Sequence, residues 1–286
     1  PAEVDLLVAG IHTGFTPVQP LPPYPTREQV AAFPRRLSYR RFDNDTAAYW
    51  HIVPAGADGS GRPGNVFAHV LLDRQAARNE PRPIELWCSP QWLTPYGPKA
   101  VLAATLSDLD PVAGTVVTAE QVARFVGGPD RRWLAVLGVL LDAVAAALAG
   151  GPPAVLGTES AARAAQWIGA VSFLMSPAAA RRLSFSTFDR ATDLGYAPGA
   201  GQHLIAVPRG DLPEVPAGLT VIDETATGPP VPAGTNPLPT WSTLARSALA
   251  DPASVAGLLS DIDRVSAQRA GQAGSHPGLP IAFAVL

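Results

Sequence analysis

The chain has 286 residues, of which 47% are hydrophobic and 16% are charged, and its formal net charge is −3. This length and apolar content predict one large domain or two smaller ones around a substantial core. Because the chain has no basic surplus, we expect neither nucleic-acid binding nor attraction to an anionic membrane surface.

The cysteine content and the apolar runs indicate the compartment of the protein and whether it crosses a membrane. Cys88 is the only cysteine, which excludes an intramolecular disulfide and predicts a reducing, cytoplasmic environment. The longest apolar run, at 133–149, contains Asp142 and is marginal in length for a membrane span, so it predicts a buried amphipathic helix. From the apolar run at 279–286 we expect either a piece of a longer protein or a tail that packs on its own core.

The first part of the chain predicts strands and one short helix. A short apolar strand is expected at 6–11, followed by a proline-rich loop at 17–25. Thr26 is a good N-cap for a helix that Pro34 ends. Aromatic and β-branched residues then predict three strands, the second and third joined as a hairpin by a glycine-rich connection; these strands are expected at 36–43, 47–54 and 65–73.

The rest of the chain begins with irregular segments and then alternates strand and helix. We expect a short strand at 83–87, a helix from Thr118 to Val126 and a long helix at 131–148. Further strands are expected at 154–158, 184–189, 203–208 and 219–223, with helices at 160–175 and 177–183 between the first two, and closing helices at 241–249 and 252–265. Strand–helix–strand with apolar strands predicts a parallel layer.

These elements predict an α/β fold, in which an N-terminal α+β domain is followed by a helical connector and a small α/β layer. We expect the N-terminal domain over residues 1–128 and a middle domain over 129–225. A proline-rich linker and the C-terminal helices are expected over 226–286.

The segment at 59–73, a glycine-rich turn that runs into a strand, is the best candidate for a site. Its side chains alternate, so one face is apolar and the other carries an amide and an imidazole. We expect Gly61 or Gly64 to supply a positive φ, because the loop lacks a phosphate-binding pattern and precedes a strand rather than a helix. The candidate ligand-binding residues are Arg62, Asn65, His69 and Tyr49.

Two other functions remain as alternatives. A hydrolase or transferase would use His69 with Asn65, His51 or Cys88. No local catalytic signature surrounds Cys88, so we assign no catalytic residue, no metal site and no cofactor, and we lean away from an enzyme. A small-ligand sensor would need a pocket lined by Tyr49, Phe67 and Trp50 or Trp92.

Two blocks of the sequence resemble one family. The block at 61–71, Gly-Arg-Pro-Gly-Asn-Val-Phe-Ala-His-Val-Leu, resembles the signature of the N-terminal domain of GTPase-associated proteins from bacterial conflict systems. The run at 162–189, which includes Trp-Ile-Gly-Ala-Val-Ser-Phe-Leu-Met-Ser-Pro, is similar to the middle domain of the same proteins. The order and spacing of the two blocks also match. The strand that opens this family's N-terminal domain is only partly matched at 6–14.

The resemblance implies a non-enzymatic adaptor or recognition component that is encoded with a GTPase in a defence-like system. It carries no catalytic residues across to this chain. Our leading prediction is therefore a cytoplasmic adaptor that binds a protein partner, with a GTPase encoded nearby as the candidate partner.

Overall fold

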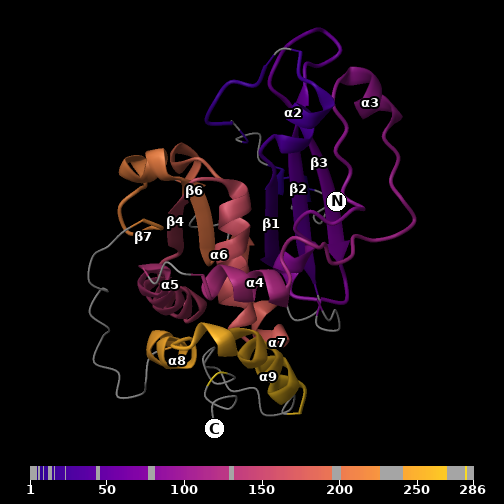
Figure 1. Ribbon diagram of the computed structural model, residues 1–286. Helices are drawn as coiled ribbons and strands as arrows, with labels where there is room; N and C mark the ends of the chain where they lie inside the picture. Colours follow the sequence, from indigo (N-terminus) through magenta and orange to yellow (C-terminus); the bar gives the residue numbers. More distant parts are fainter. Residues whose placement is uncertain are drawn as a thin grey trace.

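A computed structural model describes residues 5, 7–8, 10–11, 15, 17–22, 24–42, 46–76, 81–128, 132–194, 201–225, 241–268 and 281 of the chain. Within these residues, seven strands form one mixed sheet in the order β3-β2-β1-β5-β6-β4-β7 (Figure 1). Helices pack around the sheet and alternate with the strands of its second half. The predicted α/β class is therefore confirmed.

Three antiparallel strands form the N-terminal part of the sheet: β1 (Arg36–Arg41), β2 (Ala47–Gly56) and β3 (Asn65–Asp73). β2 and β3 form the predicted hairpin. In the connection both Gly61 and Gly64 have a φ of +86°, a conformation that glycine adopts without steric cost. The Asp58 carboxylate accepts backbone N–H bonds from Ser60 and Arg62, and these bonds hold the loop in shape.

A short helix precedes these strands as the capping pattern predicts. α2 (Arg27–Ala32) begins after Thr26, whose hydroxyl accepts the backbone N–H of Gln29. The Gln29 side chain in turn accepts the N–H of Thr26 at 2.8 Å, which completes a capping box. Thr118 caps α4 (Ala119–Val126) in a similar way, by accepting the N–H of Gln121.

The second part of the sheet is parallel, as predicted. Its strands are β4 (Ala154–Thr158), β5 (Phe185–Ser186), β6 (Leu204–Pro208) and β7 (Thr220–Asp223). Two helices lie between β4 and β5 in the chain: α6 (Ala161–Phe173) and α7 (Pro177–Ala180). The 3-10 helix η3 (Arg209–Glu214) connects β6 to β7.

The two parts of the sheet meet where β1 pairs with β5. Tyr39 lies opposite Phe185 in this antiparallel pair. Across the same joint, the Arg36 guanidinium donates to Ser186 Oγ at 3.0 Å and pairs with the Asp189 carboxylate at 3.0 Å. The sheet therefore continues across the division expected at residue 128, and that division remains a prediction.

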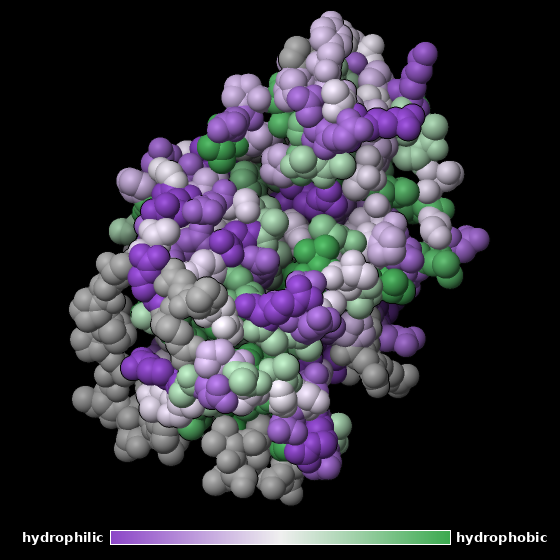
Figure 2. All heavy atoms as spheres, in the orientation of Figure 1, coloured by the Kyte–Doolittle hydropathy of each residue, from purple (hydrophilic) through white to green (hydrophobic). Residues whose placement is uncertain are grey.

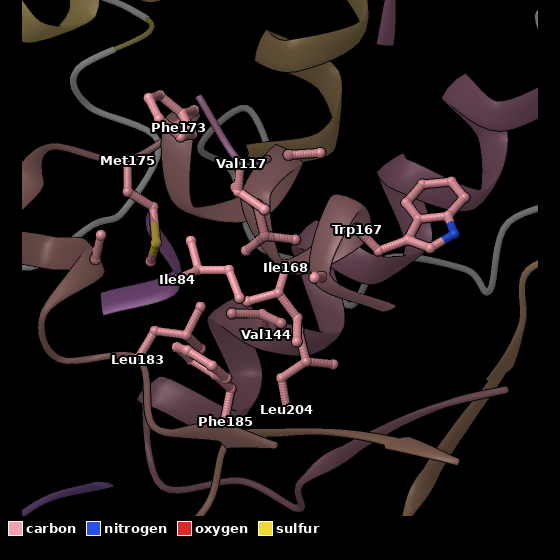
Figure 3. Packing of buried hydrophobic residues seen from close by; sticks show 14 of the residues in the cluster. Ile84, Val117, Val144, Trp167, Ile168, Phe173, Met175, Leu183, Phe185 and Leu204 are labelled. Atoms are coloured by element: carbon pink, nitrogen blue, oxygen red, sulfur yellow. The ribbon is translucent and has the colours of Figure 1, made fainter. Parts of the chain in front are cut away.

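The two faces of the parallel strands carry different cores. Leu156 and Leu204 face α6 and the long helix α5 (Arg132–Leu148), whereas Val155 and Ile205 belong to a smaller cluster on the other face. Figure 3 shows the larger core, in which Ile168 of α6 and Val144 of α5 point toward Phe185 and Leu204 of the sheet. Leu212 of η3 packs against the smaller cluster, so α6 and η3 lie on opposite faces.

The C-terminal helices pack beside α5 and α4 (Figure 1). They are α8 (Trp241–Ala248), η4 (Pro252–Ser254) and α9 (Val255–Gln268). At the start of α8, Ser242 donates its hydroxyl to Asp142 of α5 at 2.6 Å. Arg82 is buried beneath α9, where it pairs with Asp263 and donates to the carbonyls of Ser172 and Met175 at the end of α6. The carboxylate of Asp263 thus holds α9 to the end of α6.

Three local predictions differ from the structure, and one helix was not predicted. The described residues at 5, 7, 8 and 10 are helical rather than extended, and the Trp50 indole N–H donates to the carbonyl of Leu7 at 2.9 Å. The segment predicted as a strand at 83–87 is the 3-10 helix η1 (Pro83–Leu86). The helix α3 (Pro98–Ala103) was not predicted, and the strand expected at 184–189 shortens to the two residues of β5. Short apolar runs carry too little periodicity to separate helix from strand.

Several predictions concern residues outside the described part of the chain. These are the residues at 12–14, the end of the strand at 43, the helix start at 131 and the proline-rich linker at 226–240. Of the apolar run at 279–286, only Ile281 is described, and it is buried in the core. In the described residues we find no helix with the length and apolar character needed to cross a membrane.

Candidate functional site

The β2–β3 hairpin brings two of the predicted site residues together. The register places His51 directly opposite His69, so both imidazoles lie on one face of the sheet. The ring of Trp92 contacts both imidazoles. It stacks on His51 at 5.2 Å between centroids and 11° between planes, and it meets His69 edge-on at 4.9 Å and 90°.

His51 is fully buried, and neither of its ring nitrogens has a hydrogen-bond partner among the described residues. Burial, together with the positive charge of Arg35 and the neighbouring His69, lowers the pKa of His51 from its ordinary value to about 3. The imidazole is therefore neutral at physiological pH. A neutral, enclosed imidazole fits the packed interior of a hairpin better than general acid–base chemistry.

His69 lies nearer the surface and has a partner. Its Nδ1 accepts the backbone N–H of Leu93 at 3.2 Å, which places the ring proton on Nε2 in the neutral form. Burial lowers the pKa of His69 below its ordinary value. The imidazole thus anchors the segment that carries Trp92 and Leu93 to the edge strand β3.

Cys88 lies in another environment. It follows η1 in the left-handed region, with a φ of +58°, and its side chain is half-buried. The Arg35 guanidinium donates to Cys88 Sγ at 3.7 Å, but burial outweighs this cation and raises the pKa of the thiol. The thiol is therefore protonated at neutral pH, whereas a cysteine nucleophile is usually a thiolate with a lowered pKa.

Asn65 is the first residue of β3, and Arg62 lies in the turn before it. Both side chains are exposed, at or beside the turn that Asp58 organises. Asn65 is four residues from His69, which is roughly 13 Å along a strand. The structure therefore does not bring Asn65 or Arg62 to the paired imidazoles.

Tyr49 is a core residue on the same face as His51. Its ring packs on Tyr39 at 4.8 Å between centroids, and burial raises the pKa of its hydroxyl well above the ordinary value. Trp50 is the next residue along β2 and so points to the other face of the sheet. Tyr49 and Trp50 therefore cannot line one pocket.

An open groove of about 980 Å³ lies elsewhere, at the carboxyl ends of the parallel strands. One wall is formed by the segment at 17–22, α2 and Arg35, and the other by residues that follow β4 and β6. Trp87, Cys88 and Phe188 line the groove between these walls. Of the six site residues predicted from the sequence, only Cys88 belongs to this lining.

The position of the groove follows from the topology of the sheet. After β4 the chain turns into α6 on one face, and after the neighbouring strand β6 it turns into η3 on the opposite face. Adjacent parallel strands whose connections diverge in this way leave a crevice outside their carboxyl ends, which is the usual ligand position in open α/β sheets. The sequence did signal one part of this site, since Ser160 is a helix cap directly after an apolar strand.

In the described part of the chain, no three side chains of the His, Cys, Asp and Glu type gather in a way that could hold a metal ion. Several charged side chains on one side of the groove are already engaged. Arg209 bonds to Asp223 at 3.0 Å, and the Glu224 carboxylate accepts the backbone N–H of Glu159 and the indole N–H of Trp167.

Comparison with known families assigns both halves of this sheet. Residues 10–110 match the N-terminal domain, type 2, of GTPase-associated protein 1, and residues 122–225 match the middle domain of the same protein. The chain belongs to the GTPase-associated protein 1 family. The resemblance seen at 61–71 and 162–189 is thereby confirmed. The groove is lined by residues from both matched regions.

Two relatives come from strains of Mycolicibacterium smegmatis. Each is named "Putative ESX-1 scaffolding and assembly protein SaeB". The relative from strain ATCC 700084 / mc(2)155 is 51% identical over all of this chain, and the relative from strain MKD8 is 50% identical over 99% of it. The chain spans 36% and 35% of their respective lengths. No solved structure matches the chain significantly.

Proposed function

We propose that this chain is a non-enzymatic adaptor that binds protein partners as part of a scaffold. A GTPase encoded nearby is the candidate partner, in the cytoplasm and within a bacterial conflict system. Membership of a GTPase-associated family supports this proposal, and so does the scaffolding and assembly role named for the relatives.

The observation that carries the proposal is an exposed apolar segment over α3 and the residues after it. Leu102, Leu106 and Leu109 are 88%, 70% and 69% exposed, and the exposed Val112 follows them in the irregular segment after α3. Figure 2 shows apolar atoms along the side of the molecule on which α3 and this segment lie. A run of large exposed aliphatic side chains is typical of a protein interaction surface.

The proposal is tested by capture of the GTPase encoded beside this protein. The purified protein and its Leu102→Glu/Leu106→Glu variant are each mixed with the tagged GTPase, and the retained complex is measured by titration. Burial of two leucines at an interface predicts that the variant binds at least about tenfold more weakly. Both side chains are exposed, so the fold is retained.

Tyr24→Glu is the matched control, because Tyr24 is an exposed apolar side chain on a different segment. It is expected to bind as the wild type does. Wild-type protein that retains no GTPase would contradict the proposed partner. Equal capture by all three proteins would contradict the role of the α3 segment.

A further inference from the structure

Arg35 differs from three arginines of the interior that pair with aspartates. Arg36, Arg82 and Arg190 pair with Asp189, Asp263 and Asp211, respectively. Arg35 is half-buried in the wall of the groove, where it donates to the carbonyl of Ala31 at 3.0 Å and to Cys88 Sγ. A guanidinium has five N–H donors, and Arg35 meets no carboxylate among the described residues.

The opposite wall of the groove adds a second positive end. α6 has 13 residues and begins directly after β4 at Ser160, whose hydroxyl accepts the N–H of Arg163. The N–H groups of Ala161 and Ala162 precede the first intrahelical donor, and both residues line the groove. These amides and the helix dipole favour a negative charge at this point. The groove also holds Glu159, at the side where Arg209 and Asp223 are already paired.

The remaining lining is largely apolar and rich in proline. It includes Pro17, Pro20 and Pro22 from the segment before α2 and the rings of Phe33, Trp87 and Phe188, with Gln19 and Gln29 among its polar residues. Val18 and Val116 stay exposed along its length, so the groove is open to solvent rather than enclosed. Proline-lined and aromatic-lined open grooves suit an extended peptide, whose side chains fill the wall while its ends continue into solvent.

We propose that this groove binds an extended apolar segment of a partner protein, with an acidic side chain of that segment paired to Arg35. The positive charge of Arg35 and the positive end of the α6 dipole both favour an acidic side chain in the bound segment. That side chain would lie in the crevice outside the carboxyl ends of β4 and β6. This proposal rests on the proposed adaptor function and names the chemistry of one partner segment.

The test begins with selection. A phage-displayed library of 12-residue random peptides is selected on the wild-type protein. The enriched sequences are expected to carry Asp or Glu between apolar or proline residues. One selected peptide is then synthesised in two forms, one with the acidic residue and one with the corresponding amide (Asn or Gln). The affinity of the protein for each form is measured by fluorescence anisotropy.

Arg35→Gln is expected to weaken binding of the acidic peptide about tenfold or more, because it removes a charge-assisted hydrogen bond from a partly buried site. The amide peptide is expected to lose a similar factor on wild-type protein and nothing further on Arg35→Gln. Ala162→Glu places a carboxylate on the exposed first turn of α6, where it stabilises the helix and repels the acidic peptide. This second variant therefore keeps the test valid if Arg35→Gln folds poorly.

Arg27→Gln is the control, since Arg27 is an exposed arginine of α2 outside the groove lining. The proposal is overturned if no peptide is enriched, or if the enriched peptides bind Arg35→Gln and Arg27→Gln equally. It is also overturned if 10 mM sodium acetate or 10 mM inorganic phosphate, added to the assay, displaces the peptides completely, because the site would then bind any small anion. Failure here with intact GTPase capture would reject only the groove proposal. Peptide binding without GTPase capture would reject only the proposed partner.

Discussion

The buried imidazole of His51 lowers the free energy of unfolding of this protein. A buried polar group without a hydrogen bond loses its contacts with water and gains none in return. Both ring nitrogens of His51 are in this position, although the ring itself stacks well on Trp92. This destabilisation increases at acidic pH, because the imidazole is protonated in the unfolded chain and stays neutral in the folded protein.

The sign of this effect follows from the pKa of His51, which falls from 6.5 in the unfolded chain to about 3 in the folded protein. Above pH 6.5 the imidazole is neutral in both states and contributes no pH dependence. Below it, only the unfolded state is protonated, so the free energy of unfolding falls as the pH falls toward 3. Between pH 7 and pH 5 His51 should remove about 2 kcal/mol of stability.

We therefore expect His51→Phe to flatten the pH dependence of stability. The phenyl ring keeps the stack on Trp92 and carries no nitrogen, so the loss between pH 7 and pH 5 should shrink by about 2 kcal/mol. Urea unfolding at both pH values measures this difference. His203→Phe is a comparison rather than a control. Burial also lowers the pKa of His203, so its removal should flatten the slope in the same direction, while loss of the bond to the N–H of Ser184 should destabilise the protein at pH 7. An unchanged slope in His51→Phe would contradict the account.

At this scale the sequence predicted some contacts and missed others. Alternation along β2 and β3 placed Tyr49 with His51 and Asn65 with His69 on common faces. The register that sets His51 opposite His69 could not be predicted, because it depends on how the turn closes. Arg35 was not predicted as a site residue, since its importance comes from what surrounds it in space rather than from its neighbours in the chain.

Among the elements, η3 packs closely on β4 at a glycine. A Cβ atom at Gly157 would lie 2.5 Å from Cδ1 of Leu212 and 2.6 Å from its Cγ. The missing side chain is therefore what allows η3 to cover this face of the strand.

We expect Gly157→Ala to destabilise the protein by about 1–3 kcal/mol through this overlap. Truncation of the opposing side chain makes room, so Leu212→Ala should cost less in the Gly157→Ala background than in the wild type. Thermal unfolding of the two single variants and the double variant measures the coupling. Additive effects of the two substitutions would show that the overlap is relieved in another way.

Long periodic elements were the most predictable. α5, α4 and β4 follow apolar patterns with clear caps or breakers, and the structure places them close to the expected bounds. The strands predicted at 6–11 and 83–87 were wrong because a short apolar run fits a helix and a strand equally well. Contacts with Trp50 settle the first of these, and such tertiary contacts lie outside any local pattern.

At the scale of the whole molecule, the continuous sheet predicts cooperative unfolding. β1 and β5 lie at its centre, and the buried Arg36–Asp189 pair crosses their joint. We expect urea unfolding of the chain to give one transition, with the same midpoint by far-ultraviolet circular dichroism and by tryptophan fluorescence. Two separated midpoints would instead show that the matched regions unfold as independent units.

The groove could be predicted only in part from the sequence. The parallel strands and a helix over 160–175 were predicted, but the groove also needs the segment at 17–22 and α2 on its other wall, with Trp87 between the walls. Trp87 precedes Ser160 by 73 residues and Pro17 precedes it by 143, and no local pattern relates such distant parts. Family resemblance supplied the correct group of proteins without indicating the site.

The joint between β1 and β5 also constrains how this region can be engineered. If the two matched regions were cut apart, each fragment would expose an unpaired strand from the middle of a sheet, and such edges pair readily with other chains. An isolated half is therefore expected to aggregate during expression. A chimaera should therefore exchange the N-terminal and middle regions together.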